Sequence, residues 1–175
     1  FSELSLVEKA TNGINSMMNY MIKDGRVIFY IFEIILCFSI YLTTNKFIKK
    51  IIGLTPLVLT IFLKYLYRIL DNDIVSSKLF SNANFAIYLI IIVAIELGIL
   101  IVFSGKLHFQ LIGSLIYFCG FISRFVMMFS PTVFASGERT SLFLYISLIL
   151  LDMLFIKSII NKKIYCTKET IKYLN

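Results

Sequence analysis

Five long apolar runs, separated by short polar links, constrain this 175-residue chain more than any other feature of its sequence. They cover residues 27–44, 51–70, 85–104, 111–130 and 141–156. A helix rises about 1.5 Å per residue, so each run comes close to crossing a hydrocarbon core of about 30 Å. The strands of a membrane barrel would alternate apolar and polar residues, and these runs do not. The sequence therefore predicts an all-α polytopic transmembrane helix bundle with five spans.

The composition agrees with a membrane protein and argues against several other classes. Hydrophobic residues make up 59% of the chain and charged residues 15%, with a mean hydropathy of +0.89. Soluble domains are nearer 45–50% apolar and about 25% charged. Three cysteines and one histidine give no basis for a disulfide scaffold, a metal site or a cofactor site. We attribute the net charge of +7 to basic residues on the cytoplasmic side of a membrane, so we expect no nucleic-acid partner.

The residues before the first apolar run have a different pattern. Ser5 and Glu8 have the spacing of a capping box, which predicts the start of a helix. Apolar residues then recur at helical spacing with polar residues between them: Val7, Ile14, Met17, Met18 and Met21. This pattern predicts an amphipathic helix that lies on the outer membrane surface or on other helices. We therefore divide the chain into this helix and its link (1–26), the transmembrane bundle (27–160) and a basic cytoplasmic tail (161–175).

The basic residues predict the orientation of the bundle. Nine of the 17 lie in the links 45–50 and 105–110 and in the tail after residue 156. Five lie on the other side, and three fall within spans. Because cytoplasmic segments carry the excess of lysine and arginine, we expect the amino end outside and the carboxyl end in the cytoplasm.

Four cations from separate parts of the chain share one predicted depth, at the outer leaflet or its interface: Lys64, Arg68, Arg124 and Arg139. Glu33 lies at the same depth and is the expected partner of one of them. The surplus positive charge predicts a site for an anionic group, such as the phosphate of a lipid carrier. The alternative is that these side chains reach ordinary headgroups or pair structurally with Glu33 and Asp71.

Carboxyl groups inside a bilayer are costly and therefore informative. Glu33 and Glu96 interrupt apolar runs, and Glu96 lies near the middle of the third span. We expect Glu96 to face the bundle and to be protonated or hydrogen-bonded to another span. Asp152 lies towards the inner end of the fifth span.

The link between the last two spans contains Ser130–Pro131–Thr132 and then Gly137–Glu138–Arg139–Thr140. This run resembles the carboxy-terminal part of an uncharacterised family of large Gram-positive bacterial membrane proteins, which is similar to the GT-C class of lipid-dependent glycosyltransferases. The opening residues 1–9 also resemble the stretch that follows this family's extracellular Asn-Ala-Pro-Gly-Asn segment, which this chain lacks. Arg139, and less directly Ser130 and Pro131, are the positions that match the motif.

The resemblance implies the carboxy-terminal half of a multi-pass enzyme of the bacterial cell membrane that acts in cell-envelope glycan synthesis. Such an enzyme uses a polyprenyl-phosphate-linked sugar donor at the outer face, and its catalytic acidic residue lies in an early extracellular loop. We therefore expect an upstream half of the same protein, membrane lipids as partners, and no catalytic residue assignable in this chain.

Two alternatives remain open. The first is a transporter or flippase module in which Glu33, Glu96, Arg124 and Asp152 line a polar pathway. The second is a non-enzymatic membrane subunit whose charges match those of a partner.

Overall fold

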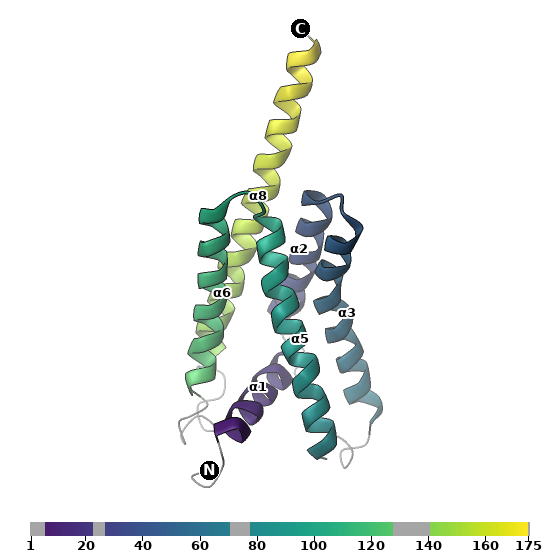
Figure 1. Ribbon diagram of the computed structural model, residues 1–175, viewed down its shortest axis with the longest axis vertical. Coiled ribbons are helices and arrows are strands. Elements are labelled where there is room, and N and C mark those ends of the chain that lie inside the picture. The colour runs from purple at the N-terminus through teal and green to yellow at the C-terminus, as the bar shows by residue number, and fades with distance from the viewer. Residues whose placement is uncertain (1–5, 23–26, 71–77, 128–140, 175) are drawn as a thin grey trace.

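A computed structural model describes residues 6–22, 27–70, 78–127 and 141–174 (Figure 1). These residues form α-helices and no strand, which confirms the predicted all-α class. The helices are α1 (Leu6–Ile22), α2 (Val27–Thr43), α3 (Phe47–Ile69), α5 (Lys78–Val102), α6 (Leu107–Met127) and α8 (Leu142–Leu174).

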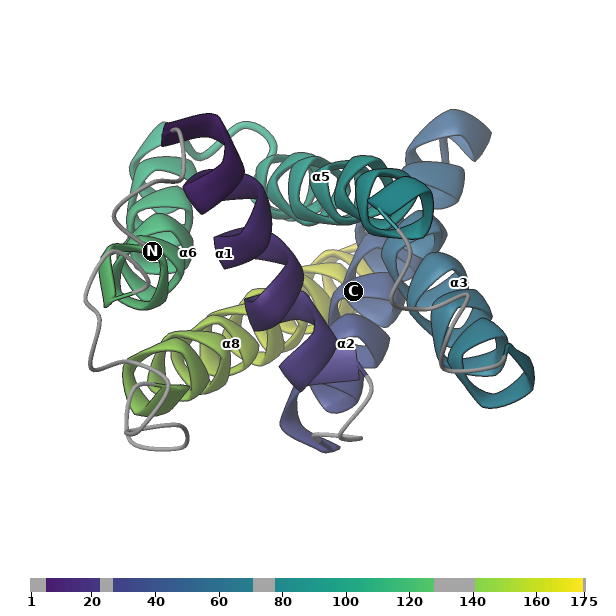
Figure 2. The same ribbon diagram turned by 90° about the horizontal axis from the view of Figure 1, so that it is seen from below.

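Five of these helices run up and down beside one another, and α1 lies across one end of the bundle (Figures 1 and 2). The axis of α1 makes an angle of 88° with that of α2. Helix α8 packs against α6 and α2, whereas α3 packs against α2 and α5. In both views α3 and α6 therefore lie on opposite sides of the molecule. The α2–α3 and α5–α6 links share the end from which the C-terminus projects (Figure 1).

Each predicted apolar run lies largely within one long helix, although the helix ends differ from those of the runs. Helix α5 begins at Lys78, before the apolar run starts, because the polar residues that precede the run continue the helix. Helix α8 continues to Leu174, through the residues predicted to form a separate tail. No glycine or proline occurs after residue 141 to end it. It projects well beyond the other helices (Figure 1).

Fewer helices pass a length-and-hydropathy criterion for membrane spans than the five predicted. Within the described residues, Asn82–Val102 and Leu142–Ile160 are long and apolar enough, and the bent pair Glu8–Ile22 and Val27–Thr43 gives a third if it counts as one span. Leu107–Ser123 is apolar but shorter. Four basic residues near the two ends of α3 lower its hydropathy: Lys49, Lys50, Lys64 and Arg68. The structure therefore supports a helical membrane protein with two or three such helices.

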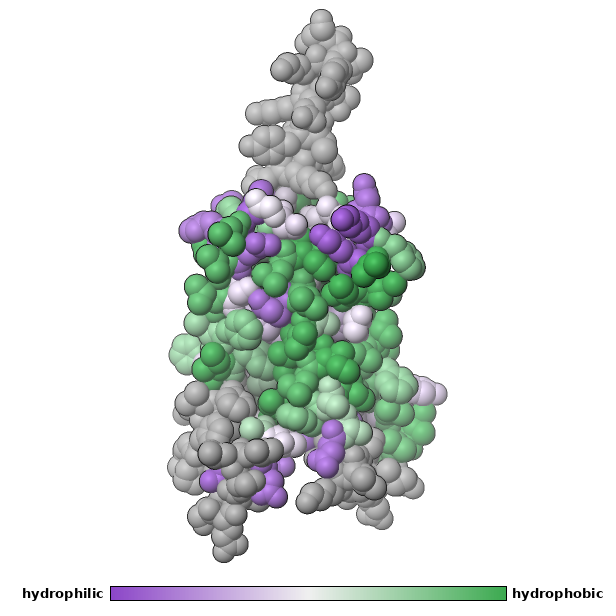
Figure 3. All heavy atoms as spheres, viewed as in Figure 1, coloured by the Kyte–Doolittle hydropathy of each residue, from purple (hydrophilic) through white to green (hydrophobic). Residues whose placement is uncertain are grey.

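Helices of the bundle have one buried face and one exposed face, and both faces are apolar, as α2 illustrates. On α2, Phe29, Phe32, Leu36 and Ile40 recur every three or four residues and are at most 1% exposed. The opposite face exposes large apolar side chains as well: Ile31, Ile34, Phe38 and Tyr41. A soluble helix would carry polar residues there. The face of the bundle seen in Figure 3 is mostly apolar, with hydrophilic residues concentrated towards its two ends.

Glycines allow the helices to approach closely. Gly53 of α3 and Gly98 of α5 both face Ile40 of α2. A Cβ atom at Gly53 would lie 2.6 Å from Ile40 Cδ1, and one at Gly120 of α6 would lie 2.5 Å from Ser147 Oγ of α8. Small residues at helix contacts are typical of bundles held together in lipid by van der Waals packing.

The apolar face of α1 packs against the bundle. Met17, Met18, Met21 and Ile22 are at most 1% exposed, and the helix contacts α3, α5 and α6. Figure 2 shows α1 lying across the end of the bundle. The structure therefore places this amphipathic helix on other helices, which is one of its two predicted positions.

Candidate functional site

Glu33 lies in the core, and its partner is a hydroxyl group. The side chains of Glu33 on α2 and Thr60 on α3 are 1% and 0% exposed. Thr60 Oγ1 donates a hydrogen bond of 2.7 Å to Glu33 Oε1. The sequence instead predicted a cation as the partner of Glu33. Lys64, one turn along α3, is exposed, and its ammonium nitrogen lies 4.8 Å from the centre of the Tyr30 ring. Its long stem keeps the charge at the surface, where it costs least.

Glu96 is tied to a neighbouring helix in the same way. Ser114 Oγ of α6 donates a hydrogen bond of 2.5 Å to Glu96 Oε1 on α5. Tyr117 lies one turn further along α6, is 1% exposed, and donates from its hydroxyl to the backbone oxygen of Ile92 at 3.2 Å. Two hydrogen bonds, from Ser114 and from Tyr117, therefore join α6 to α5 within one turn of α6.

Asp152 adds a third interior carboxyl group. It lies on α8, is 9% exposed, and its Oδ1 atom is buried without a hydrogen-bond partner among the described residues. The Oε2 atoms of Glu33 and Glu96 are likewise buried without a hydrogen-bond partner among the described residues. The interior of the bundle thus offers three carboxyl groups able to accept a proton or a further hydrogen bond. No group of three or more metal-binding side chains occurs within the described helices and links.

The structure describes the side chains of only two of the four cations that were predicted at the outer level. Lys64 and Arg68 are exposed on α3, one turn apart. Arg124 belongs to α6, on the other side of the bundle, and its side chain lies outside the described part of the structure. Arg139 lies outside the described residues, as do Ser130 and Pro131. The described helices therefore bring Lys64 and Arg68 together but do not bring α3 beside α6.

A polar cluster that the sequence analysis missed connects α1 with α3 and α5. The hydroxyls of Tyr67 and Tyr88 both contact Asn19 Oδ1, at 2.6 Å and 2.5 Å, and lie 2.5 Å from each other. Asn84 Nδ2 donates to the Tyr67 hydroxyl at 2.9 Å. Tyr88 is 0% exposed and Asn84 5%. The sequence signal for this cluster was the presence of one amide, Asn84, and two phenols, Tyr67 and Tyr88, at one predicted depth on the otherwise apolar helices α3 and α5.

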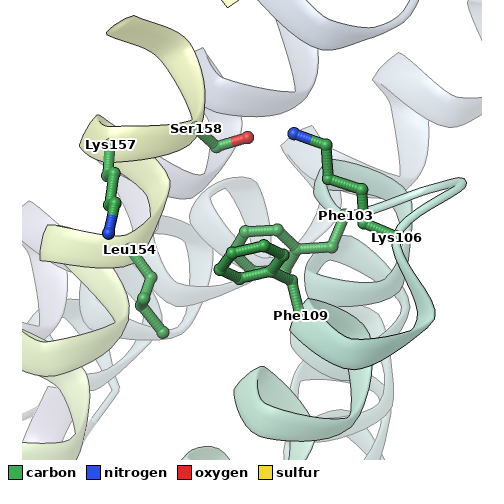
Figure 4. Close-up of a pocket in the computed structure, with 6 residues that line it drawn as sticks. All are labelled: Phe103, Lys106, Phe109, Leu154, Lys157 and Ser158. Atoms are coloured by element: carbon green, nitrogen blue, oxygen red, sulfur yellow. The ribbon is translucent and has the colours of Figure 1, made fainter. Parts of the chain in front are cut away.

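Elsewhere on the bundle, the described residues form a groove and a notch. A shallow groove of about 360 Å³ between α3 and α5 is lined almost entirely by apolar side chains, among them Leu89, Val93 and Leu97, and offers little to recognise a polar ligand. A smaller notch between the α5–α6 link and α8 contains two lysines and a serine (Figure 4).

Comparison with known proteins gives no match to this chain among protein-family models, curated proteins or solved structures. The resemblance to the GT-C-like family therefore depends on the quoted sequence motifs alone.

Proposed function

We propose that this chain is the membrane-embedded part of a multi-pass protein in which α2, α3, α5, α6 and α8 each span the bilayer. The large apolar side chains exposed by these helices support the proposal, because contact between water and so large an apolar surface is unfavourable. Lys46, Lys50 and Lys106 lie at the end that carries the C-terminus, which supports a cytoplasmic position for that end.

For the activity, our leading proposal is a GT-C-like glycosyltransferase that acts in bacterial cell-envelope glycan synthesis with a polyprenyl-phosphate-linked sugar donor. The sequence resemblance suggests the class, and the exposed pair Lys64 and Arg68 is the observation that supports a role in carrier binding. Arginine binds phosphate oxygens in a bidentate manner and lysine acts as a point charge. In this proposal the chain binds the carrier phosphate, and the catalytic base belongs to an upstream part of the protein.

Binding of a short-chain polyprenyl phosphate to the purified protein in neutral detergent tests this proposal. We expect Arg68→Ala to weaken binding by roughly tenfold, since one charged hydrogen bond contributes about 1.5–3 kcal/mol. Lys64→Arg should be tolerated better than Arg68→Lys. Lys46→Ala removes an exposed charge at the opposite end and should change binding by less than about twofold. Equal effects of Arg68→Ala and Lys46→Ala would contradict the proposal.

The second candidate is a transport or flippase module, and the interior carboxyl groups favour it. Glu33, Glu96 and Asp152 come from three helices, and hydroxyl groups of neighbouring helices hold the first two. Ionisable residues that face the interior of a membrane bundle commonly mark proton or ion pathways.

Proton movement in proteoliposomes that contain the protein and a pH-sensitive dye tests this second candidate. We expect Glu33→Gln and Glu96→Gln to abolish a proton flux that Glu8→Gln, on the exposed face of α1, leaves intact. Absence of any flux in the unmodified protein would remove the transport candidate. Failure of both the binding and the flux test would favour the remaining alternative, a non-enzymatic membrane subunit.

A further inference from the structure

The notch near the cytoplasmic end of the proposed bundle combines positive charge with an aromatic floor. It is lined by Phe103, Lys106, Phe109, Leu154, Lys157 and Ser158, and encloses about 20 Å³ (Figure 4). These residues come from the end of α5, the start of α6 and α8, which are separate in the sequence but adjacent here.

Two polar groups face each other across the mouth of the notch. In Figure 4 the ammonium group of Lys106 extends towards the Ser158 hydroxyl on the facing helix. The Lys157 ammonium group points along α8 and away from both, but its stem is exposed and flexible, so it can turn towards a ligand at the mouth. Helix α6 begins at Leu107, directly after Lys106, so the unpaired N–H groups of its first turn add positive potential at the same place.

The floor of the notch is apolar. The rings of Phe103 and Phe109 stack with their centres 5.9 Å apart, and Phe103 also contacts Phe155, at 5.7 Å. The Lys106 ammonium nitrogen lies 5.9 Å from the centre of the Phe109 ring. A ligand that fits these surroundings has a negative head for the lysines and an apolar body for the rings.

The position of the notch along the bundle identifies the source of such a ligand. The candidate spans end at Val102 and Ile160, within a few residues of Lys106 and Lys157. This is the depth at which lipid phosphates lie. The enclosed space holds roughly one water molecule, so a phosphate must sit at the mouth with the rest of its molecule against the outer wall of the bundle.

We propose that this notch binds the phosphate group of an anionic phospholipid from the cytoplasmic leaflet, between Lys106 and Ser158, with Lys157 turning in as a second cation. A free phosphate ion has the same head chemistry but no part that uses the apolar floor. The site is separate from Lys64 and Arg68, which lie towards the other end of α3.

Lipid retention tests the proposal. The full chain is reconstituted in nanodiscs of phosphatidylcholine with 10–30% phosphatidylglycerol, and the lipids that remain bound are counted by native mass spectrometry. We expect retention of phosphatidylglycerol over phosphatidylcholine, and a loss of roughly tenfold in this preference for Lys106→Gln with Lys157→Gln, because the phosphate loses its charge-assisted contacts.

A matched pair separates a specific site from a diffuse basic surface. Lys46→Gln with Lys49→Gln removes the same charge at the same end of the bundle, on the α3 side, and should reduce the preference by less than about twofold. Lys106→Arg with Lys157→Arg should retain it. Ser158→Ala removes only the hydroxyl and should cost about threefold, which keeps the test decisive if the double glutamine variant does not fold.

Three outcomes would overturn the proposal. The first is an equal loss in the two glutamine pairs, and the second is the absence of any preference for phosphatidylglycerol. The third is binding of inorganic phosphate in neutral detergent that depends on Lys106 and Lys157, because it would identify a soluble phosphate ligand instead of a lipid.

Discussion

A carboxyl group buried among apolar side chains requires a hydrogen-bond donor, and on α3 that donor is Thr60. Its hydroxyl bonds to Glu33, whereas the hydroxyl of Thr55 on the same helix bonds only to the backbone oxygen of Ile51, at 2.9 Å. Of the two threonines, only Thr60 therefore connects two helices through its hydroxyl group.

We expect Thr60→Val to lower the free energy of unfolding by about 1 kcal/mol, because it leaves the Glu33 carboxyl without its donor. Thr55→Val, at a half-buried position without an inter-helix bond, should change it by less than about 0.5 kcal/mol. Unfolding in mixed detergent and SDS micelles, followed by circular dichroism, measures both. A loss as large for Thr55→Val would show that the inter-helix bond is not the cause.

The interior carboxyl groups illustrate which parts of the site the sequence could predict. Glu33 and Glu96 stand out because a carboxyl group in an apolar run is expensive. Their partners Thr60 and Ser114 do not stand out, because serine and threonine are common in membrane helices and bond to their own backbone. Which hydroxyl meets which carboxyl depends on the rotation of each helix about its axis, and sequence spacing does not determine that rotation between helices.

Tyr88 gives a second test at the scale of single residues. Its buried hydroxyl contacts Asn19 and Tyr67, so Tyr88→Phe keeps the ring and removes the connection between α5 and α1. We expect faster hydrogen–deuterium exchange in α1 and a loss of about 1–2 kcal/mol in stability. Tyr65→Phe, at a residue that is 62% exposed, should leave the exchange of α1 unchanged. Unaltered exchange in Tyr88→Phe would mean that apolar packing alone holds α1.

At the scale of helices, close approach of α6 and α8 depends on Gly120. A Cβ atom there would lie 2.6 Å from the Cβ atom of Ser147 and 3.4 Å from the backbone of Leu144. Neither atom can move without displacing the helix. The contact is therefore a property of the two helices together, and the length of an apolar run gives no information about it.

We expect Gly120→Ala to destabilise the bundle by about 1–3 kcal/mol, although alanine is the better helix former, because the overpacked contact outweighs the gain in propensity. Ser147→Gly alone should cost about 1 kcal/mol. The double variant Gly120→Ala with Ser147→Gly moves the small residue to the facing helix and should recover most of the loss. A double-mutant cycle in micelles measures this coupling, and simple additivity of the two changes would show that the contact does not limit packing.

The helix ends show what apolar runs predict well and what they predict poorly. Each run coincides with most of one helix, α2, α3, α5, α6 or α8, whereas fewer of these helices are long and apolar enough to count as candidate spans. The runs did not predict the start of α5 at Lys78 or the continuation of α8 to Leu174. Backbone hydrogen bonding extends a helix through polar residues until a breaker stops it, and hydropathy does not report on that.

At the scale of the whole molecule, polar residues at the two ends of the bundle define the proposed orientation. The end with the C-terminus carries Lys46, Lys50, Lys106 and Lys157, and α1 lies across the other end. Both binding proposals depend on this orientation, since one places a lipid phosphate near Lys64 and Arg68 outside and the other places one near Lys106 inside.

One candidate span allows a matched test of this orientation, because its first residue, Asn82, and Ser104, two residues after its last, are both exposed. After replacement of Cys37, Cys119 and Cys166 by alanine, we expect Asn82→Cys to react with a membrane-impermeant maleimide in intact cells. Ser104→Cys should react only after the membrane is permeabilised, since the basic side of the bundle faces the cytoplasm. Asn45→Cys, in the link between α2 and α3, should behave as Ser104→Cys does. If Ser104→Cys reacts in intact cells and Asn82→Cys does not, the bundle is inverted and the two phosphate sites exchange sides.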